Sequence, residues 1–113
     1  MSLRQDFNIF HIYVIIKKVF VKKGIVWLPE DESENLHLYD LSFSKAKEAI
    51  LNSMTLRLRN IDGDYTYIGP NDDLSEIYLV YAIADQGFTR ITFARRATPN
   101  EMKGFFDKIK GIV

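Results

Sequence analysis

The stretch from Arg90 to Met102 constrains the fold most, because a strand must end and a helix must begin within it. Thr98 is a favourable helix N-cap, and Pro99 suits the first helical position. Glu101 lies where its carboxylate can reach back to the Thr98 amide, which completes a capping box worth about 1 kcal/mol. The sequence therefore predicts a strand that passes directly into a helix.

Three arginines mark this junction. Arg95 and Arg96 fall at the end of the predicted strand, and Arg90 lies earlier on it. A planar guanidinium group binds phosphate through two parallel hydrogen bonds, so these side chains suit a phosphate-bearing ligand. Two arginines after a strand also commonly form solvent-exposed pairs with local carboxylates. Both interpretations stay open from these residues alone.

The composition predicts one soluble globular domain. The chain has 113 residues, of which 47% are hydrophobic and 27% charged, enough for a single packed core. It contains no cysteine, which excludes disulfide scaffolds, cysteine-ligated zinc and thiol nucleophiles. A reducing compartment is permitted, and we expect a cytoplasmic protein.

The charges are unevenly distributed although they sum to zero. Residues 1–26 carry five basic and one acidic side chain, 27–86 carry four and twelve, and 87–113 carry six and two. Basic ends thus flank an acidic middle. This division indicates either internal pairing or a surface of two signs that binds a polyanion on one side and a basic partner on the other.

Residues 1–23 are interpreted as an N-terminal extension, and residues 24–113 as a single domain that begins near Gly24. The longest uncharged run, Phe7–Ile16, is about half the roughly 20 residues that a membrane span needs. No signal-peptide cleavage site follows it. Its β-branched and aromatic residues favour an added edge strand, but an appendage outside the core is equally compatible.

Two helices are expected before the main sheet. Pro29 at a first helical position, followed by acidic residues, predicts a helix to about Tyr39. Ser42 then caps a helix from Phe43 to about Asn52, whose apolar residues are spaced to bury one side.

The rest of the chain predicts a sheet and a last helix. After a short strand at Gly24–Trp27, four segments have strand character: 55–59, 65–68, 77–84 and 88–95. Asp62-Gly63 predicts a two-residue hairpin, and Asp85-Gln86-Gly87 a three-residue hairpin. Apolar residues of the last helix should then pack on the sheet: Met102, Phe105, Phe106 and Ile109. We therefore expect an α+β fold, with an antiparallel sheet of four to five strands, two N-terminal helices and one C-terminal helix.

Several short motifs carry a resemblance to a known family. They are Trp27 with Asn35, Leu41-Ser42-Phe43, Ile68-Gly69, Leu79-Val80-Tyr81, and Arg90-Ile91 followed by Ala94-Arg95-Arg96-Ala97-Thr98 and Glu101. Between about Val26 and Phe106 the chain resembles the BrnT family, ribonuclease toxins of bacterial type II toxin–antitoxin pairs with a RelE-like fold. The resemblance implies a cytoplasmic endoribonuclease, partnered by a cognate antitoxin protein.

The sequence departs from the family at polar positions. Leu38-Tyr39-Asp40 stands where the family commonly has Lys-His-Gly, Asp64 stands where it has an arginine, and Ala84-Asp85-Gln86 lacks a further arginine. Three basic contributors are therefore absent. A catalytically decayed protein that only binds an antitoxin-like partner is the alternative interpretation.

The resemblance implies cleavage without a metal ion. The RNA 2′-hydroxyl would be the nucleophile, so the protein must supply a base, an acid and cations for the phosphorane. Arg95, with Arg90 or Arg96, is the candidate for the cations. The candidates for proton transfer are His37 on the first helix, His11 in the extension, and Tyr39 or Tyr81. The RNA-binding candidates are Arg96, Tyr81 and Phe93, since bases stack on aromatic rings.

No metal or cofactor is expected. Two histidines without cysteines do not make a convincing zinc site, and the sequence has no glycine-rich phosphate loop. Asp72, Asp73 and Glu76 could bind a hard cation, but a polar turn accounts for them.

Overall fold

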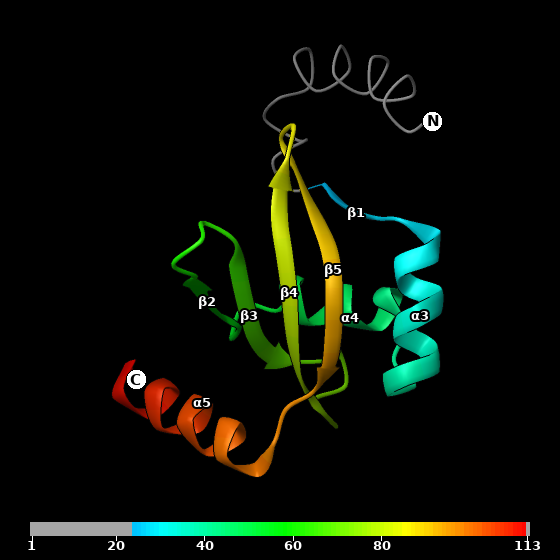
Figure 1. Cartoon of the computed structure of the whole chain (residues 1–113). Helices are drawn as coiled ribbons and strands as arrows, with labels where there is room; N and C mark the ends of the chain where they lie inside the picture. The colour runs from blue at the N-terminus through cyan, green and yellow to red at the C-terminus, as the bar shows by residue number, and fades with distance from the viewer. Residues whose placement is uncertain (1–23, 113) are drawn as a thin grey trace.

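The computed structural model describes residues 24–112 and shows an α+β fold, as predicted (Figure 1). Predictions for residues 1–23 lie outside the described residues. The elements, in order, are β1 (Ile25–Trp27), α3 (Pro29–Tyr39), α4 (Phe43–Leu51), β2 (Leu56–Arg59), β3 (Tyr65–Pro70), β4 (Ile77–Asp85), β5 (Phe88–Arg96) and α5 (Pro99–Ile112).

The five strands form one mixed sheet in the order β1-β5-β4-β3-β2. Strands β2 to β5 pair antiparallel in sequence order, and β4 is central, as expected. Strand β1 instead pairs parallel with β5, so the expectation of a purely antiparallel sheet was incomplete. The reason is that α3 and α4 carry the chain from β1 to β2 at the opposite edge, and three reversals then return it beside β1.

Both predicted hairpins form, with loop lengths that differ from the predictions. Five residues, 60–64, connect β2 to β3, and Gly63 has φ 95°. Only Gln86 and Gly87 connect β4 to β5, because Asp85 already pairs with Phe88. Both turn residues have positive φ, 54° and 88°, as a tight turn between twisted strands requires.

One face of the sheet is closed by helices. Tyr67, Val80 and Ala94 lie side by side across β3, β4 and β5 and belong to the core that packs on α4. Phe43 and Ala46 of α4 are fully buried there. In α3, the buried Asn35 donates to the carbonyls of Leu41 and Ala94 (both 2.9 Å) and accepts from the Ala94 amide (3.0 Å). Asn35 thereby fixes α3 to β5.

The opposite face, termed here the open face, carries two rows of directly paired residues. One row contains Leu56, Ile68, Leu79 and Arg95, and the other contains Leu58, Thr66, Tyr81 and Phe93. A bulge at Thr92 separates Ile91, which is buried on the closed face, from Phe93 on the open face. The open face is therefore aliphatic toward β2 and aromatic and cationic toward β5.

Helix α5 only partly follows its prediction. Phe105 is buried, but the adjacent Phe106 is 46% exposed, so the expected apolar stripe does not pack on the sheet along its whole length. In Figure 1 the helix leaves the lower end of β5 and runs past the ends of the strands toward the β2 side. Its N-terminal turns therefore border the open face.

Candidate functional site

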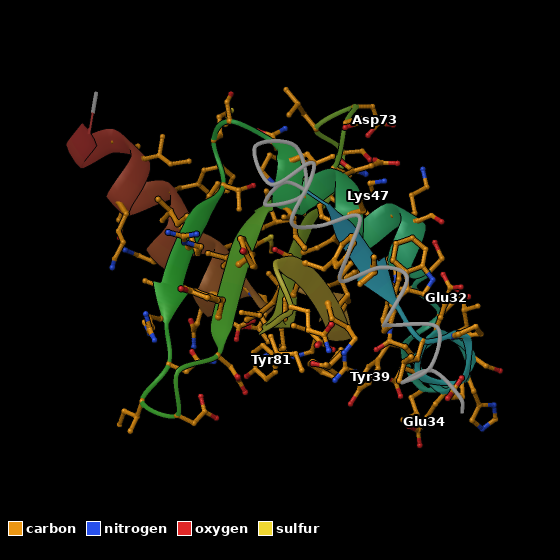
Figure 2. All side chains as sticks on the ribbon, turned by 90° about the horizontal axis from the view of Figure 1, so that it is seen from above. Glu32, Glu34, Tyr39, Lys47, Asp73 and Tyr81 are labelled. Atoms are coloured by element: carbon orange, nitrogen blue, oxygen red, sulfur yellow. The ribbon has the colours of Figure 1, made fainter. Side chains whose placement is uncertain are left out.

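Three aromatic side chains adjoin Arg95 on the open face. The rings of Tyr81 and Phe93 are 5.2 Å apart, and the Tyr39 ring meets Phe93 edge-on at 5.0 Å. Tyr81 is 41% exposed and Tyr39 38% exposed. Figure 2 shows both tyrosines on the same side of the sheet, opposite to Lys47 of α4. We call Tyr39, Tyr81, Phe93 and Arg95 the aromatic–arginine cluster.

Arg95 is held by the start of α5. Its Nη1 and Nη2 donate to the two carboxylate oxygens of Glu101, each at 2.8 Å. Glu101 also accepts from the Thr98 amide at 2.8 Å, while the Glu101 amide donates to Thr98 Oγ1 at 3.2 Å. The predicted capping box is therefore present. The same carboxylate that completes it also orients the guanidinium group.

The guanidinium group keeps one edge available. Nη1 also donates to the Arg96 carbonyl at 3.2 Å, and no hydrogen bond within residues 24–112 uses Arg95 Nε. The edge formed by Nε and the outer hydrogen of Nη2 can thus donate two parallel hydrogen bonds to an oxyanion.

Charge in the cluster is locally balanced. The hydrogen bonds from Arg95 lower the pKa of Glu101 from 4.5 to about 2, so this carboxylate stays ionised. In return, the hydrogen bond to Glu101 raises the pKa of Arg95, with smaller contributions from Tyr81 and Tyr39. The cluster therefore offers short-range hydrogen bonds and not a large positive field.

Arg96 lies on the other side of the sheet. Its Nε donates to Glu76 at 2.6 Å, and its Nη1 donates to the carbonyls of Tyr39 and Asp40 at 3.2 and 3.3 Å. These carbonyls end α3, where Asp40 is the C-cap and adopts φ 53°. Arg96 thus stabilises the end of α3, and the structure does not bring it together with Arg95.

Within residues 24–112, neither of the other two predicted catalytic residues forms a hydrogen bond with Arg95. Arg90 lies five residues earlier on β5, roughly 16 Å away at the rise of a strand. There it pairs with Asp85 at 3.0 Å and Asp31 at 3.8 Å. His37 is exposed on α3, two residues after the buried Asn35 and therefore on the outer side of the helix. Of the predicted residues, the structure gathers Arg95, Tyr81 and Phe93.

Sequence reasoning named Tyr39 only among several candidates for proton transfer and not as a neighbour of Arg95, and it assigned Glu101 only a capping role. The capping-box spacing could have indicated that Glu101 faces the end of the strand carrying Arg95. No local signal places Tyr39 there, because its contact with Phe93 joins residues far apart in sequence.

The described residues contain no group of three histidine, aspartate or glutamate side chains arranged to hold a metal ion. Nor does any helix between residues 24 and 112 have the length and apolarity to cross a membrane.

Comparison with solved structures places this geometry in a known fold. The chain superposes on the crystal structure of the Brucella abortus ribonuclease toxin BrnT with a TM-score of 0.55, covering 66% of this chain and 96% of the toxin. This chain has the fold of a ribonuclease toxin. The sequence identity is 15%, so the relationship is one of fold. No family model matches the sequence, and no curated protein does. The predicted α+β architecture is confirmed, and the resemblance to BrnT is supported at the level of fold.

Proposed function

We propose that the open face binds single-stranded RNA and cleaves it without a metal ion, with Arg95 stabilising the phosphorane. The observation that carries the proposal is the guanidinium group of Arg95, which is anchored along one edge by Glu101 and available along the other. A donor already oriented before the substrate arrives stabilises developing charge most effectively, since it need not reorganise during the reaction.

The aromatic residues supply the second part of the proposal. Tyr81 and Tyr39 expose their rings on either side of Phe93, where unpaired bases can stack. The 2′-hydroxyl of the RNA attacks the neighbouring phosphorus and releases its proton to solvent water, and the bond from phosphorus to the 5′-oxygen breaks. The tyrosine hydroxyl groups are candidates to donate a proton to that leaving oxygen, after which the tyrosine regains a proton from water. His37 and Arg90 have no part in this arrangement, because both lie away from Arg95.

Incubation of the purified protein with mixed single-stranded RNA in chelator tests the activity. Arg95→Lys keeps the charge but loses the planar fork, so cleavage should fall about 100-fold, nearly as far as in Arg95→Ala. Arg59→Lys is the matched control, because Arg59 lies over Tyr65 on the other face of β2. No cleavage by folded protein at micromolar concentration would exclude the enzyme, and an unchanged rate in Arg95→Lys would exclude the role of Arg95.

A protein that has lost cleavage and binds an antitoxin-like partner is the second candidate. It is favoured by the Arg95–Glu101 pair, which leaves the cluster without excess positive charge, and by an apolar groove beside it. A protein that binds such a partner tightly but leaves RNA intact would support this candidate over the first.

A further inference from the structure

An apolar groove separates α5 from the β2 side of the open face. Its volume is about 290 Å³. The strands contribute mainly leucine and isoleucine, and α5 contributes Phe105 together with charged residues at the rim. The lining residues are Leu56, Leu58, Ile68, Leu79, Glu101, Gly104, Phe105 and Lys108.

Strand β2 forms both the outer wall of this groove and an edge of the sheet. Within residues 24–112 only β3 pairs with it. Alternate residues of an edge strand direct their N–H and C=O groups away from the sheet, where another extended chain can bind them. The strand is also accessible, since Arg57, Leu58 and Arg59 are all exposed.

The other face of β2 is cationic. Arg57 and Arg59 stack over the Tyr65 ring, with their guanidinium carbons 4.8 and 5.6 Å from its centre. Neither arginine forms an ion pair with another described residue. The edge strand therefore presents an apolar side toward the groove and two unneutralised cations on the opposite side.

We propose that β2 and the groove bind an extended segment of another protein in which apolar and acidic residues alternate. The segment adds a sixth strand beside β2. Its apolar side chains extend the row begun by Leu56 and Leu58 and enter the groove, while its carboxylates face Arg57 and Arg59. Since side chains along a strand alternate between faces, this sequence pattern satisfies both sides of β2 simultaneously.

Charge argues against a second copy of this chain as the occupant. Antiparallel pairing of two β2 strands would place both copies of Arg57 and Arg59 on the same face, where like charges repel. The apolar lining of the groove argues against RNA, which would present phosphates and sugars to leucine side chains. The inference deepens the partner-binding candidate above and does not depend on ribonuclease activity.

The test uses the full chain and three fluorescent nine-residue peptides. In the first, valine and glutamate alternate, and in the second, valine and lysine alternate. The third has the composition of the first, with its valines grouped in one block and its glutamates in another. Fluorescence anisotropy should show binding of the valine–glutamate peptide at least tenfold tighter than that of either other peptide. Leu58→Glu, a change at an exposed position, should weaken this binding at least tenfold.

A charge swap gives the sharper result. The double variant Arg57→Glu/Arg59→Glu should lose at least tenfold in affinity for the valine–glutamate peptide and gain affinity for the valine–lysine peptide. Lys45→Glu/Lys47→Glu on α4 is the control of equal charge change and should alter neither affinity. RNA cleavage, if present, should persist in both double variants, so failure here and failure of the ribonuclease proposal are distinguishable.

Three results would overturn the inference. Equal binding of the alternating and rearranged glutamate peptides would show that strand pairing is not involved. Concentration-dependent dimerisation abolished by Leu58→Glu would assign the edge to a second copy. Loss of RNA affinity in Arg57→Glu/Arg59→Glu, with peptide binding unchanged, would assign the arginines to nucleic acid.

Discussion

The two faces of the sheet are built from the same strands but differ in how far their side chains are exposed. On the closed face, Val80, Ala82 and Ala94 have no exposed surface, and Asn35 satisfies the backbone groups where α3 meets β5. On the open face, Leu58 and Tyr81 remain 47% and 41% exposed. Stability should therefore depend on the closed face, and ligand binding on the open face.

The adjacent Arg95 and Arg96 reproduce this contrast within two residues. Arg95 reaches Glu101 on the open face, and Arg96 reaches Glu76 and the end of α3. Two neighbouring side chains of identical chemistry thus belong to different environments because successive strand residues point to opposite faces.

Two phenylalanines test the difference in stability between the two faces most directly. Phe43 is fully buried beneath the closed face, whereas Phe106 of α5 is 46% exposed. Phe43→Ala should lower the free energy of unfolding by about 4 kcal/mol through cavity formation. Phe106→Ala should lower it by about 1 kcal/mol or less. Urea unfolding measures both, and equal losses would contradict the division between the faces.

Asn35→Ala should have the next largest effect. It removes three hydrogen bonds to buried backbone groups of Leu41 and Ala94, which should cost about 3 kcal/mol. Amide hydrogen exchange should show faster exchange at Ala94, whose amide loses its acceptor. His37→Ala, on the outer side of the same helix, is the control and should leave stability nearly unchanged.

Glu101 predicts a dependence of stability on pH. Its pKa in the folded protein is about 2, below its ordinary 4.5, so its contribution is complete above about pH 5 and is lost as the pH falls toward 2. The free energy of unfolding should fall between pH 6 and pH 3 in both proteins. It should fall less in Glu101→Gln than in the unmodified chain, by on the order of 1–2 kcal/mol after solvent screening. Parallel losses in the two proteins would contradict the assignment.

Thr98→Ala should have the smallest effect on stability. It separates the stabilisation of α5 from the binding of a ligand. Loss of the cap should cost about 1 kcal/mol. RNA affinity per folded molecule should be nearly unchanged, because Glu101 still binds Arg95. A large loss of affinity would show that the cap itself orients the guanidinium group.

Much of the fold could be predicted because its signals are local. Pro29 and the following acidic residues mark the start of α3, Ser42 caps α4 through Lys45 N at 3.2 Å, and Thr98 and Glu101 form their box. Each signal depends on residues within one helical turn. The apolar segment 77–84 likewise identified the central strand, β4.

The site was less predictable because its contacts are long-range. Tyr39 of α3 contacts Phe93 of β5, and Arg96 is held away from the site by Glu76, twenty residues earlier in the chain. Neither pairing has a local signature. The parallel pairing of β1 similarly depends on where the two helices carry the chain. Arg95 was identified from its place at the end of the predicted strand and from a family resemblance, but its anchoring by Glu101 emerged only with the structure.

The bulge at Thr92 also determines which face of the sheet each later residue of β5 occupies. Counting in strict alternation from the buried Ile91 would assign Phe93 and Arg95 to the helix-covered side and Arg96 to the open side. The inserted residue reverses that assignment for everything that follows it. Deletion of Thr92 would remove the bulge and leave Arg95 on the open face, whereas a β5 of the present length without the bulge would present Arg96 there instead.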